Sequence, residues 1–341
     1  MEDIRLAIGL IGFVSVAAFG VTFRLMRGRS TRVQDLTAAL IVVLIFIYVR
    51  TVWGQLWIVR YIPLPSVIVL SNWFPILLAA LAAVVWLRLE PVRDRSDSSV
   101  SDPGASLRSV LRRLPVMLVL LAAAVYSLMY FIPSKAPECR DEWEYPRIPM
   151  IWPVCLQTTP FTCSAAAAAT ILNTLNIETT EQEMARLCLT KSGTTWLGLY
   201  HGLSTRLLGS GHRVEFFEGD LETLRDAAAG RPVILCCRLD PDDAERFPSY
   251  QQDGGWIPGT AHSVVYFGRL ADYHVIGDPS RGYEVWTTQD LSMLWTGQAL
   301  RTVNQSVPAA RGYLKKGSDP LEGSKIAIRT AARRGSDPFF R

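Results

Sequence analysis

The sequence predicts an α+β domain that follows about four membrane-spanning helices. Of its 341 residues, 49% are hydrophobic and only 19% are charged, below the roughly 25% charged residues of an ordinary soluble protein. Most of the apolar excess lies before residue 134. After residue 150 the pattern changes to predicted helices followed by a run of predicted strands, the order typical of an α+β domain with a mainly antiparallel sheet.

Four apolar segments make up the first third of the chain. A membrane helix needs about 20 mainly apolar residues, and we expect spans at about 6–24, 36–57, 68–88 and 114–133. The first segment reads as an uncleaved helix rather than a signal peptide, because Glu2 and Asp3 replace the usual basic start and no clear cleavage site precedes the next span. Residues 1–133 are therefore expected to be a transmembrane region.

The arginines predict the orientation of these spans. They gather in segments 24–34 and 88–113, whereas the connection between spans two and three offers little beyond Arg60. Basic loops face the cytoplasm, so a multi-pass protein of the bacterial inner (cell) membrane is expected, with its C-terminal domain on the extracytoplasmic side. The polar stretch 94–106 would then be a flexible cytoplasmic loop.

The remaining chain divides into a linker at 134–150, a folded domain at 151–302 and a basic, partly disordered tail at 303–341. In the folded domain, helices are expected after Cys163 and over 180–188, 196–208 and 221–230. Strands are expected at 213–218, 232–239, 261–269, 273–279 and 283–288. Cys236 and Cys237 lie in an apolar strand and are interpreted as buried thiols.

Three residues have the chemistry and the positions for a cysteine-dependent acyl transfer site. Cys163 begins an Ala-rich helix, where free backbone amides and the helix dipole favour a thiolate. His262 starts one predicted strand and Asp278 ends the next, sixteen residues later. A hairpin would bring them together as an imidazole–carboxylate pair. Gln157, six residues before Cys163, is the candidate oxyanion donor.

Four segments resemble the motifs of the C39-type, bacteriocin-processing cysteine peptidases. CLQTTPFTCSAAAAATIL resembles the nucleophile motif with its Gln six residues ahead of the Cys. GTTWLGLYHGLSTRLLG, HSVVYFG and GDPSRGY resemble the helix, His strand and Asp turn. The resemblance covers roughly 150–295 and implies a papain-like fold, with Cys163, His262 and Asp278 as triad and Gln157 at the oxyanion.

The chain also departs from that family. Thr162 and Ser164 flank the Cys where many members have Asp and Gly, and the insertion 240–259 precedes His262 as a candidate lid or partner-binding loop. No Walker A motif occurs, so the leader-peptide substrate of transporter-fused members does not simply carry over.

We therefore expect a membrane-anchored cysteine peptidase that acts on a peptide or protein substrate. Two alternatives stay open: acyl transfer of the transglutaminase kind by the same triad, and an inactive domain that binds peptides. No cofactor is expected, and the absence of CxxC and HxxxH pairs argues against a zinc site. The net charge of +4 gives no reason to expect nucleic acid. The lipid bilayer is the expected partner, and membrane proteins such as a transporter are possible ones.

Overall fold

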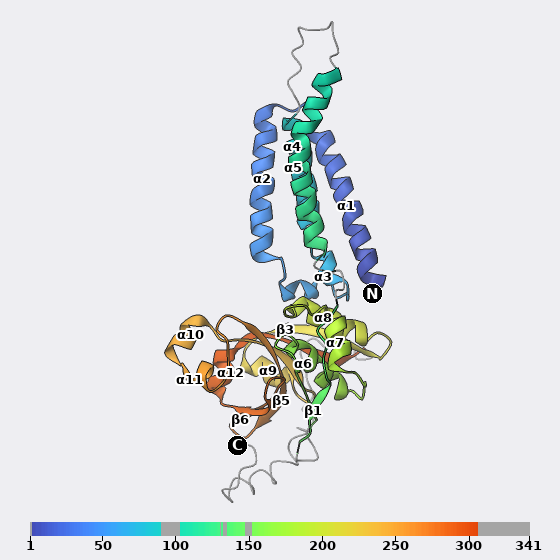
Figure 1. The fold of residues 1–341 in the computed structure, drawn as a ribbon. Helices are drawn as coiled ribbons and strands as arrows, with labels where there is room; N and C mark the ends of the chain where they lie inside the picture. Colours follow the sequence, from blue (N-terminus) through green and yellow to red (C-terminus); the bar gives the residue numbers. More distant parts are fainter. Residues whose placement is uncertain (1, 90–102, 130, 132–134, 147–151, 306–341) are drawn as a thin grey trace, which may run out of the picture. The chain divides into compact units, whose positions relative to one another are not determined.

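The computed structural model describes residues 2–89, 103–129, 131, 135–146 and 152–305, except for the side chains of 103–110 and 112. The chain forms two compact units, Met1–Pro133 and Ser134–Arg341 (Figure 1). The expected loop at 94–106 lies mostly outside the described residues, as does nearly all of the expected tail at 303–341.

The first unit consists of helices. They are α1 (Glu2–Met26), α2 (Thr31–Thr51), the 3-10 helix η1 (Leu56–Arg60), α3 (Val67–Leu70), α4 (Phe74–Arg88) and α5 (Pro103–Met129). Helix α4 contacts α1, α2 and α5. Large apolar side chains such as those of Leu6, Phe13 and Val16 remain more than 70% exposed, an apolar surface suited to lipid.

Three segments of the described residues are long and apolar enough to cross a membrane: Glu2–Met26, Thr31–Thr51 and Val67–Arg88. The second begins and ends earlier than the expected 36–57, because the α-helix starts at Thr31, ends at Thr51 and is followed by η1. The fourth expected span is not confirmed, since the apolar part of α5, Arg113–Met129, is shorter than the other three.

The second unit is built on a six-stranded antiparallel sheet in the order β3-β8-β4-β5-β6-β7. Its strands are β3 (His212–Glu218), β4 (Val233–Arg238), β5 (Ala261–Leu270), β6 (Tyr273–Asp278), β7 (Gly282–Trp286) and β8 (Trp295–Asn304). The helices are α6 (Cys163–Asn173), α7 (Glu181–Leu187), α8 (Trp196–Arg206), α9 (Leu221–Ala227), α10 (Pro241–Arg246), α11 (Ser249–Gln252) and α12 (Thr288–Leu294). This arrangement confirms the predicted mixture of helices followed by an antiparallel sheet.

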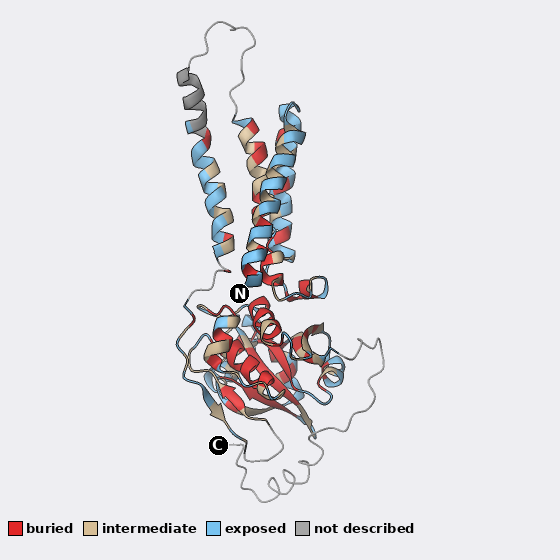
Figure 2. Ribbon diagram, turned by 90° about the vertical axis from the view of Figure 1, so that its right-hand side faces the viewer, coloured by how far each residue is buried: buried red, intermediate tan, exposed pale blue. Residues whose placement is uncertain are grey.

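Helix α6 packs closely on the sheet because its side chains are small. All five alanines from Ala165 to Ala169 are fully buried, and the helix contacts β5, β4 and β2. A core cluster that includes Leu235, Val264, Tyr266 and Leu291 joins the sheet to α9 and α12. The buried residues of this unit gather in the sheet and the helices that cover it (Figure 2).

Six described elements of the second unit were not predicted: the short strands β1 and β2, the helices α10, α11 and α12, and strand β8. Strand β8 lies between β3 and β4, and α12 precedes it. The expected strand at 283–288 ends at Trp286, because Thr287 caps α12 by accepting a hydrogen bond from the Asp290 amide at 3.1 Å. The expected linker contributes a strand of its own, since β1 (Glu142–Glu144) pairs with β2 (Val154–Leu156).

Candidate active site

The thiol of Cys163 lies at the start of α6. Thr162 is the N-cap residue, and its buried hydroxyl donates to the Thr159 carbonyl at 3.1 Å instead of capping the helix. The first amides of α6 are therefore left without a side-chain acceptor, and the positive end of the helix dipole faces the thiol. The sequence places the cysteine at this point because the Ala-rich helix begins at Cys163 itself.

The predicted hairpin brings His262 and Asp278 together. Strands β5 and β6 pair in antiparallel register from Val265 opposite Gly277 to Leu270 opposite Tyr273. His262 at the start of β5 and Asp278 at the end of β6 then meet at one edge, where Nε2 of His262 lies 2.8 Å from Oδ1 of Asp278. The Asp278 side chain is only 3% exposed, whereas the His262 side chain is 17% exposed.

Asp278 is held by the turn that follows it. The backbone amide and the hydroxyl of Ser280 both donate to Oδ1 of Asp278 at 2.7 Å. These bonds and the His262 ring stabilise the charged carboxylate. Burial alone would raise the pKa of Asp278, but His262 and Ser280 reverse that effect and hold it below its usual range. The carboxylate is thus ionised and points at the imidazole.

Cys163 and His262 perturb each other in opposite directions. Burial would raise the pKa of the Cys163 thiol, but a hydrogen bond and the charge of His262 outweigh it, with help from Ser263 and Ser164, so that the pKa is lowered. Burial would lower the pKa of His262, but Asp278 and Cys163 raise it. This pattern is that of a thiolate–imidazolium pair. Since Nε2 faces Asp278, Nδ1 is the ring nitrogen left for the thiol.

Gln157 lies in the loop that leads to Cys163. Its backbone amide donates to the Pro279 carbonyl at 2.7 Å, which joins this loop to the turn after Asp278. Its side-chain Nε2 donates to the Thr159 carbonyl at 3.0 Å, and its buried Oε1 has no partner. The expected oxyanion donor therefore belongs to the same structural neighbourhood, with one of the two Nε2 hydrogens occupied by Thr159.

A buried glutamate fixes this loop. Both oxygens of Glu181, at the start of α7, accept hydrogen bonds from Thr158, from its amide at 2.9 Å and from its hydroxyl at 2.7 Å. Glu181 is fully buried. The sequence marks it only as the first residue of a helix, so its role as an anchor for the residue next to Gln157 was not predicted.

Two further contacts at the site were also missed. The hydroxyls of Ser164 and Ser263 lie 2.8 Å apart and join α6 to β5 directly behind Cys163 and His262. The ring of Trp256 stands edge-on to the His262 ring, with centroids 5.3 Å apart. Trp256 belongs to the insertion at 240–259, and the only signal in the sequence was a tryptophan close to a candidate catalytic histidine.

The insertion is packed onto the domain. Ala244 of α10 is buried in the core cluster, and Tyr250 and Trp256 pack against it. The Gly259 amide donates to the Leu239 carbonyl at 2.8 Å and so ties the end of the insertion back to its start.

The other thiols differ from Cys163. Cys236 and Cys237 are fully buried on β4, as predicted, and burial raises the pKa of both. Burial also raises the pKa of the half-buried Cys139 to about 11. Among the residues described, Cys163 is the cysteine whose pKa is lowered. Within the same residues, no group of three or more His, Cys, Asp or Glu side chains is arranged to hold a metal ion.

Similar proteins are found among solved structures. No family model matches the chain, and no curated protein matches it. The peptidase domain of Streptococcus ComA, a bifunctional ABC transporter involved in quorum sensing, is similar with 21% identity and a TM-score of 0.35, over 44% of this chain and 96% of that domain. A double-glycine-motif protease from an AMS/PCAT transporter, solved with its leader peptide, is similar with 18% identity and a TM-score of 0.34. The match covers 48% of this chain and 99% of that protease.

The peptidase domain of Streptococcus mutans ComA gives 20% identity and a TM-score of 0.29, over 44% of this chain and 98% of that domain. Each similarity covers less than half of this chain. The roles of Cys163, His262, Asp278 and Gln157 are therefore argued from their own geometry.

Proposed function

We propose that this chain is a membrane-anchored cysteine peptidase that hydrolyses a peptide bond. The main support is the arrangement of three side chains: His262 Nε2 lies 2.8 Å from the buried Asp278, and the neighbouring Cys163 and His262 lower the pKa of the thiol and raise that of the imidazole. A thiolate, an imidazolium and an orienting carboxylate in this order are the groups that nucleophilic acyl chemistry requires.

Each group has one role in the proposed reaction. The Cys163 sulfur attacks the carbonyl carbon of the scissile bond and gives a tetrahedral oxyanion. The intermediate collapses to a thioester, the C–N bond breaks, and the departing amine takes the proton from His262. His262 then removes a proton from water, which attacks the thioester and restores the thiolate. Asp278 keeps the ring oriented throughout and stabilises its charged form before the amine leaves and again after water is deprotonated.

Gln157 and the start of α6 would stabilise the oxyanion. The second hydrogen of Gln157 Nε2 is not used by Thr159, and the first amides of α6 have no intrahelical acceptor. Donors held in this way before the reaction stabilise the charge that develops on the carbonyl oxygen. The hydrogen bond from the Gln157 amide to the Pro279 carbonyl would hold this donor next to the turn that follows Asp278.

The helical unit would hold the peptidase at a membrane. Its three long apolar helices and their exposed apolar side chains support insertion in a bilayer. From the arginine distribution we propose several spans in a bacterial inner membrane and an extracytoplasmic peptidase domain. Fusion of a compartment-sensitive reporter after Asn304 tests this orientation: periplasmic reporter activity is expected, and cytoplasmic activity would reverse it.

Thiol labelling of the full-length protein in lipid nanodiscs tests the site. At neutral pH an iodoacetamide probe used below stoichiometry is expected to modify Cys163, because its thiol is the one with a lowered pKa. Cys163→Ala should remove this labelling and leave the melting curve unchanged. The matched control is Cys139→Ala, which removes a half-buried thiol of raised pKa and should keep full labelling.

Cleavage of a peptide library, analysed by mass spectrometry, then tests the reaction itself. New peptide ends are expected with the wild type and not with Cys163→Ala. Activity that survives in Cys163→Ala would refute the assignment. Products with new isopeptide or amide bonds in place of free ends would instead indicate acyl transfer, and labelling without any product would indicate a peptide-binding domain.

A further inference from the structure

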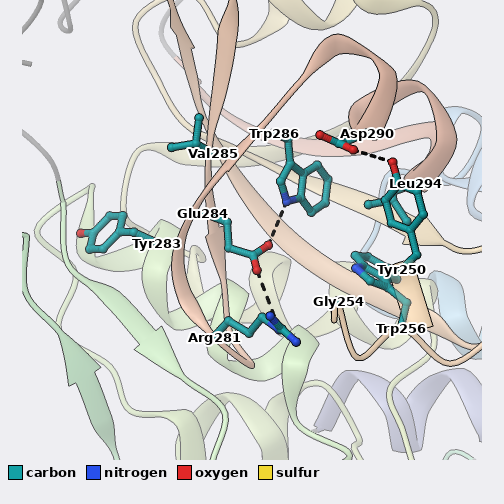
Figure 3. A pocket seen from close by; sticks show the side chains of 10 residues that line it. All are labelled: Tyr250, Gly254, Trp256, Arg281, Tyr283, Glu284, Val285, Trp286, Asp290 and Leu294. Atoms are coloured by element: carbon teal, nitrogen blue, oxygen red, sulfur yellow. Dashed lines mark hydrogen bonds and ion pairs between the residues drawn. The ribbon is translucent and has the colours of Figure 1, made fainter. Parts of the chain in front are cut away.

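A cavity of about 540 Å³ lies on the far side of Trp256 from His262. Its lining includes Tyr250 and Trp256 from the insertion, Arg281, Glu284 and Trp286 from β7 and the turn before it, and Asp290 from α12. Figure 3 shows the Trp286 ring above the opening, with the Glu284 carboxylate and Arg281 on one side and Tyr250 and Trp256 on the other. None of these residues belongs to the proposed triad.

Trp256 forms the wall between this cavity and the reactive histidine. Its ring stands edge-on to His262, with centroids 5.3 Å apart, and it also contacts Trp286, with centroids 6.0 Å apart. The turn that holds Asp278 continues directly into Arg281 and β7. A group bound in the cavity would therefore lie next to the histidine and carboxylate half of the proposed site.

The insertion is shaped to leave this space open. A Cβ atom at Gly254 would meet the Tyr250 carbonyl at 2.5 Å and the Trp256 ring at 3.0 Å, so a larger residue there would push the Trp256 ring or the backbone of the insertion out of place. The Arg281 guanidinium donates to the Asp253 carbonyl at 2.6 Å and joins the insertion to the turn before β7.

Glu284 is an incompletely neutralised carboxylate on the wall of this cavity. Its Oε2 accepts a hydrogen bond from the Trp286 indole at 2.8 Å, but the nearest cation to Oε1, Nε of Arg281, is 3.8 Å away. Burial and the nearby Asp278 raise the pKa of Glu284. Asp290 is already engaged, by Tyr250 and by the Thr287 cap. Glu284 is thus the acid that would gain most from a bound cation.

Aromatic faces around a carboxylate favour a cation. Trp and Tyr rings attract ammonium and guanidinium groups through their negative faces, and the three described charged groups of the lining, Glu284, Asp290 and Arg281, carry two negative charges against one positive. A lysine or arginine side chain fits this chemistry. A neutral side chain would gain the aromatic contact but would leave Glu284 with only the Trp286 indole and the Arg281 guanidinium at 3.8 Å.

We infer that this cavity binds a lysine or arginine side chain of the substrate on the leaving-group side of the scissile bond. This inference depends on the proposed function. In that reaction the carbonyl oxygen turns towards Gln157 and the start of α6, whereas the amine leaves past His262 after taking its proton. Because the cavity borders the Trp256 ring that contacts His262, it would receive a side chain that follows the cut.

Binding can be tested without turnover. Full-length Cys163→Ala is labelled with fluorotryptophan in nanodiscs, and the resonance of Trp286, assigned with Trp286→Phe, is followed by ¹⁹F NMR. Arginine amide should shift this resonance saturably. The uncharged isostere citrulline amide should bind at least about tenfold more weakly. Equal binding of the two amides would overturn the inference.

Two variants of opposite effect control for damage to the fold. Glu284→Gln removes the charge and should abolish the preference for arginine amide. Arg281→Gln removes the competing cation and should tighten arginine amide binding by severalfold, a gain that partial unfolding cannot produce. Weaker binding in Arg281→Gln, or an unchanged preference in Glu284→Gln, would contradict the assignment of the cavity.

The peptide library separates the two proposals. Cut sites of the wild type should be enriched in lysine and arginine just after the cut, and Glu284→Gln should lose this enrichment. Arginine amide binding without any cleavage would refute the peptidase and keep the cavity assignment. Cleavage without basic enrichment would refute the cavity assignment and keep the peptidase.

Discussion

Nε2 of His262 lies 2.8 Å from Oδ1 of Asp278, whose side chain is only 3% exposed. The two residues come from adjacent antiparallel strands, so the hairpin itself aligns them. The Ser280 amide and hydroxyl hold Asp278 from the other side. The imidazole is consequently held at Nε2 by the carboxylate, and Nδ1 is the nitrogen left for Cys163.

The pH dependence of Cys163 labelling follows from this arrangement. His262 lowers the pKa of Cys163, and Asp278 and Cys163 raise the pKa of His262. The reactive ion pair therefore exists above the lowered thiol pKa and is lost as the pH falls through it. The labelling rate should fall as the pH drops through this lowered pKa and should reach its plateau at a lower pH than the rate of an ordinary thiol, as measured by alkylation stopped at successive times.

Asp278→Asn should move this profile. Without the carboxylate the pKa of His262 falls and the thiolate loses its cationic partner, so the acid limb shifts to higher pH. Labelling at pH 7 should slow by about tenfold or more, since one pKa unit is a tenfold change in population. Asp242→Asn, on an exposed residue of the insertion, is the control. An unshifted profile in Asp278→Asn would disprove the coupling.

The reactivity of the thiols should depend on folding. Cys188, Cys236 and Cys237 are buried with raised pKa values, so they should resist alkylation in the native protein. Intact-mass analysis after brief labelling at neutral pH should give one adduct, at Cys163. In denaturant all six cysteines should react. Early modification of Cys236 or Cys237 under native conditions would contradict the packing of β4.

The buried pair Ser164 and Ser263 should show strong coupling in stability. Their hydroxyls are 2.8 Å apart, so either alanine variant leaves the other hydroxyl buried without its partner. Each single variant should cost about 1–3 kcal/mol of unfolding free energy. The double variant should cost less than the sum of the two. Denaturant titrations of the four proteins measure this cycle, and strict additivity would show that the hydroxyls do not interact.

Gly277 should not tolerate a side chain. A Cβ atom there would lie 2.6 Å from the Phe267 ring and 2.8 Å from a Val154 methyl group. Gly277→Ala should destabilise the second unit by about 1–3 kcal/mol. It should also slow Cys163 labelling, because Asp278 is the next residue. Gly9→Ala, where nothing lies within 4 Å, is the control, and equal melting points for the two variants would rule out this crowding.

Local patterns in the sequence were enough to predict the parts of the site that lie within single elements. The apolar runs around residues 264 and 275 predicted β5 and β6, and the alanines after Cys163 predicted α6. The pairing of β5 with β6 then followed from their short connection. His262 and Asp278 were found in this way because both end a strand of the same hairpin.

Long-range features could not be predicted in the same way. Strand β8 contains Gly297, Gln298 and Arg301 and lacks clear alternation, so only its place between β3 and β4 makes it a strand. The contacts of Trp256 with His262 and of Glu181 with Thr158 depend on how two loops fold back. No local pattern in the sequence predicts such contacts. The first places Trp256 between the cavity and His262, and the second fixes the loop that carries Gln157.

The position of β8 has a consequence for biosynthesis. Strand β3 pairs only with β8 in the described sheet, and β4 pairs with β8 on one side. A nascent chain that has already released Cys163 and β3 from the ribosome must therefore wait for about ninety more residues, from Glu218 to Asn304, before β8, the strand that joins β3 to β4, is complete. In an incomplete chain the sheet around Cys163 and His262 would not yet be formed. We therefore expect the reactive pair of Cys163 and His262 to form only when synthesis of this domain is almost complete.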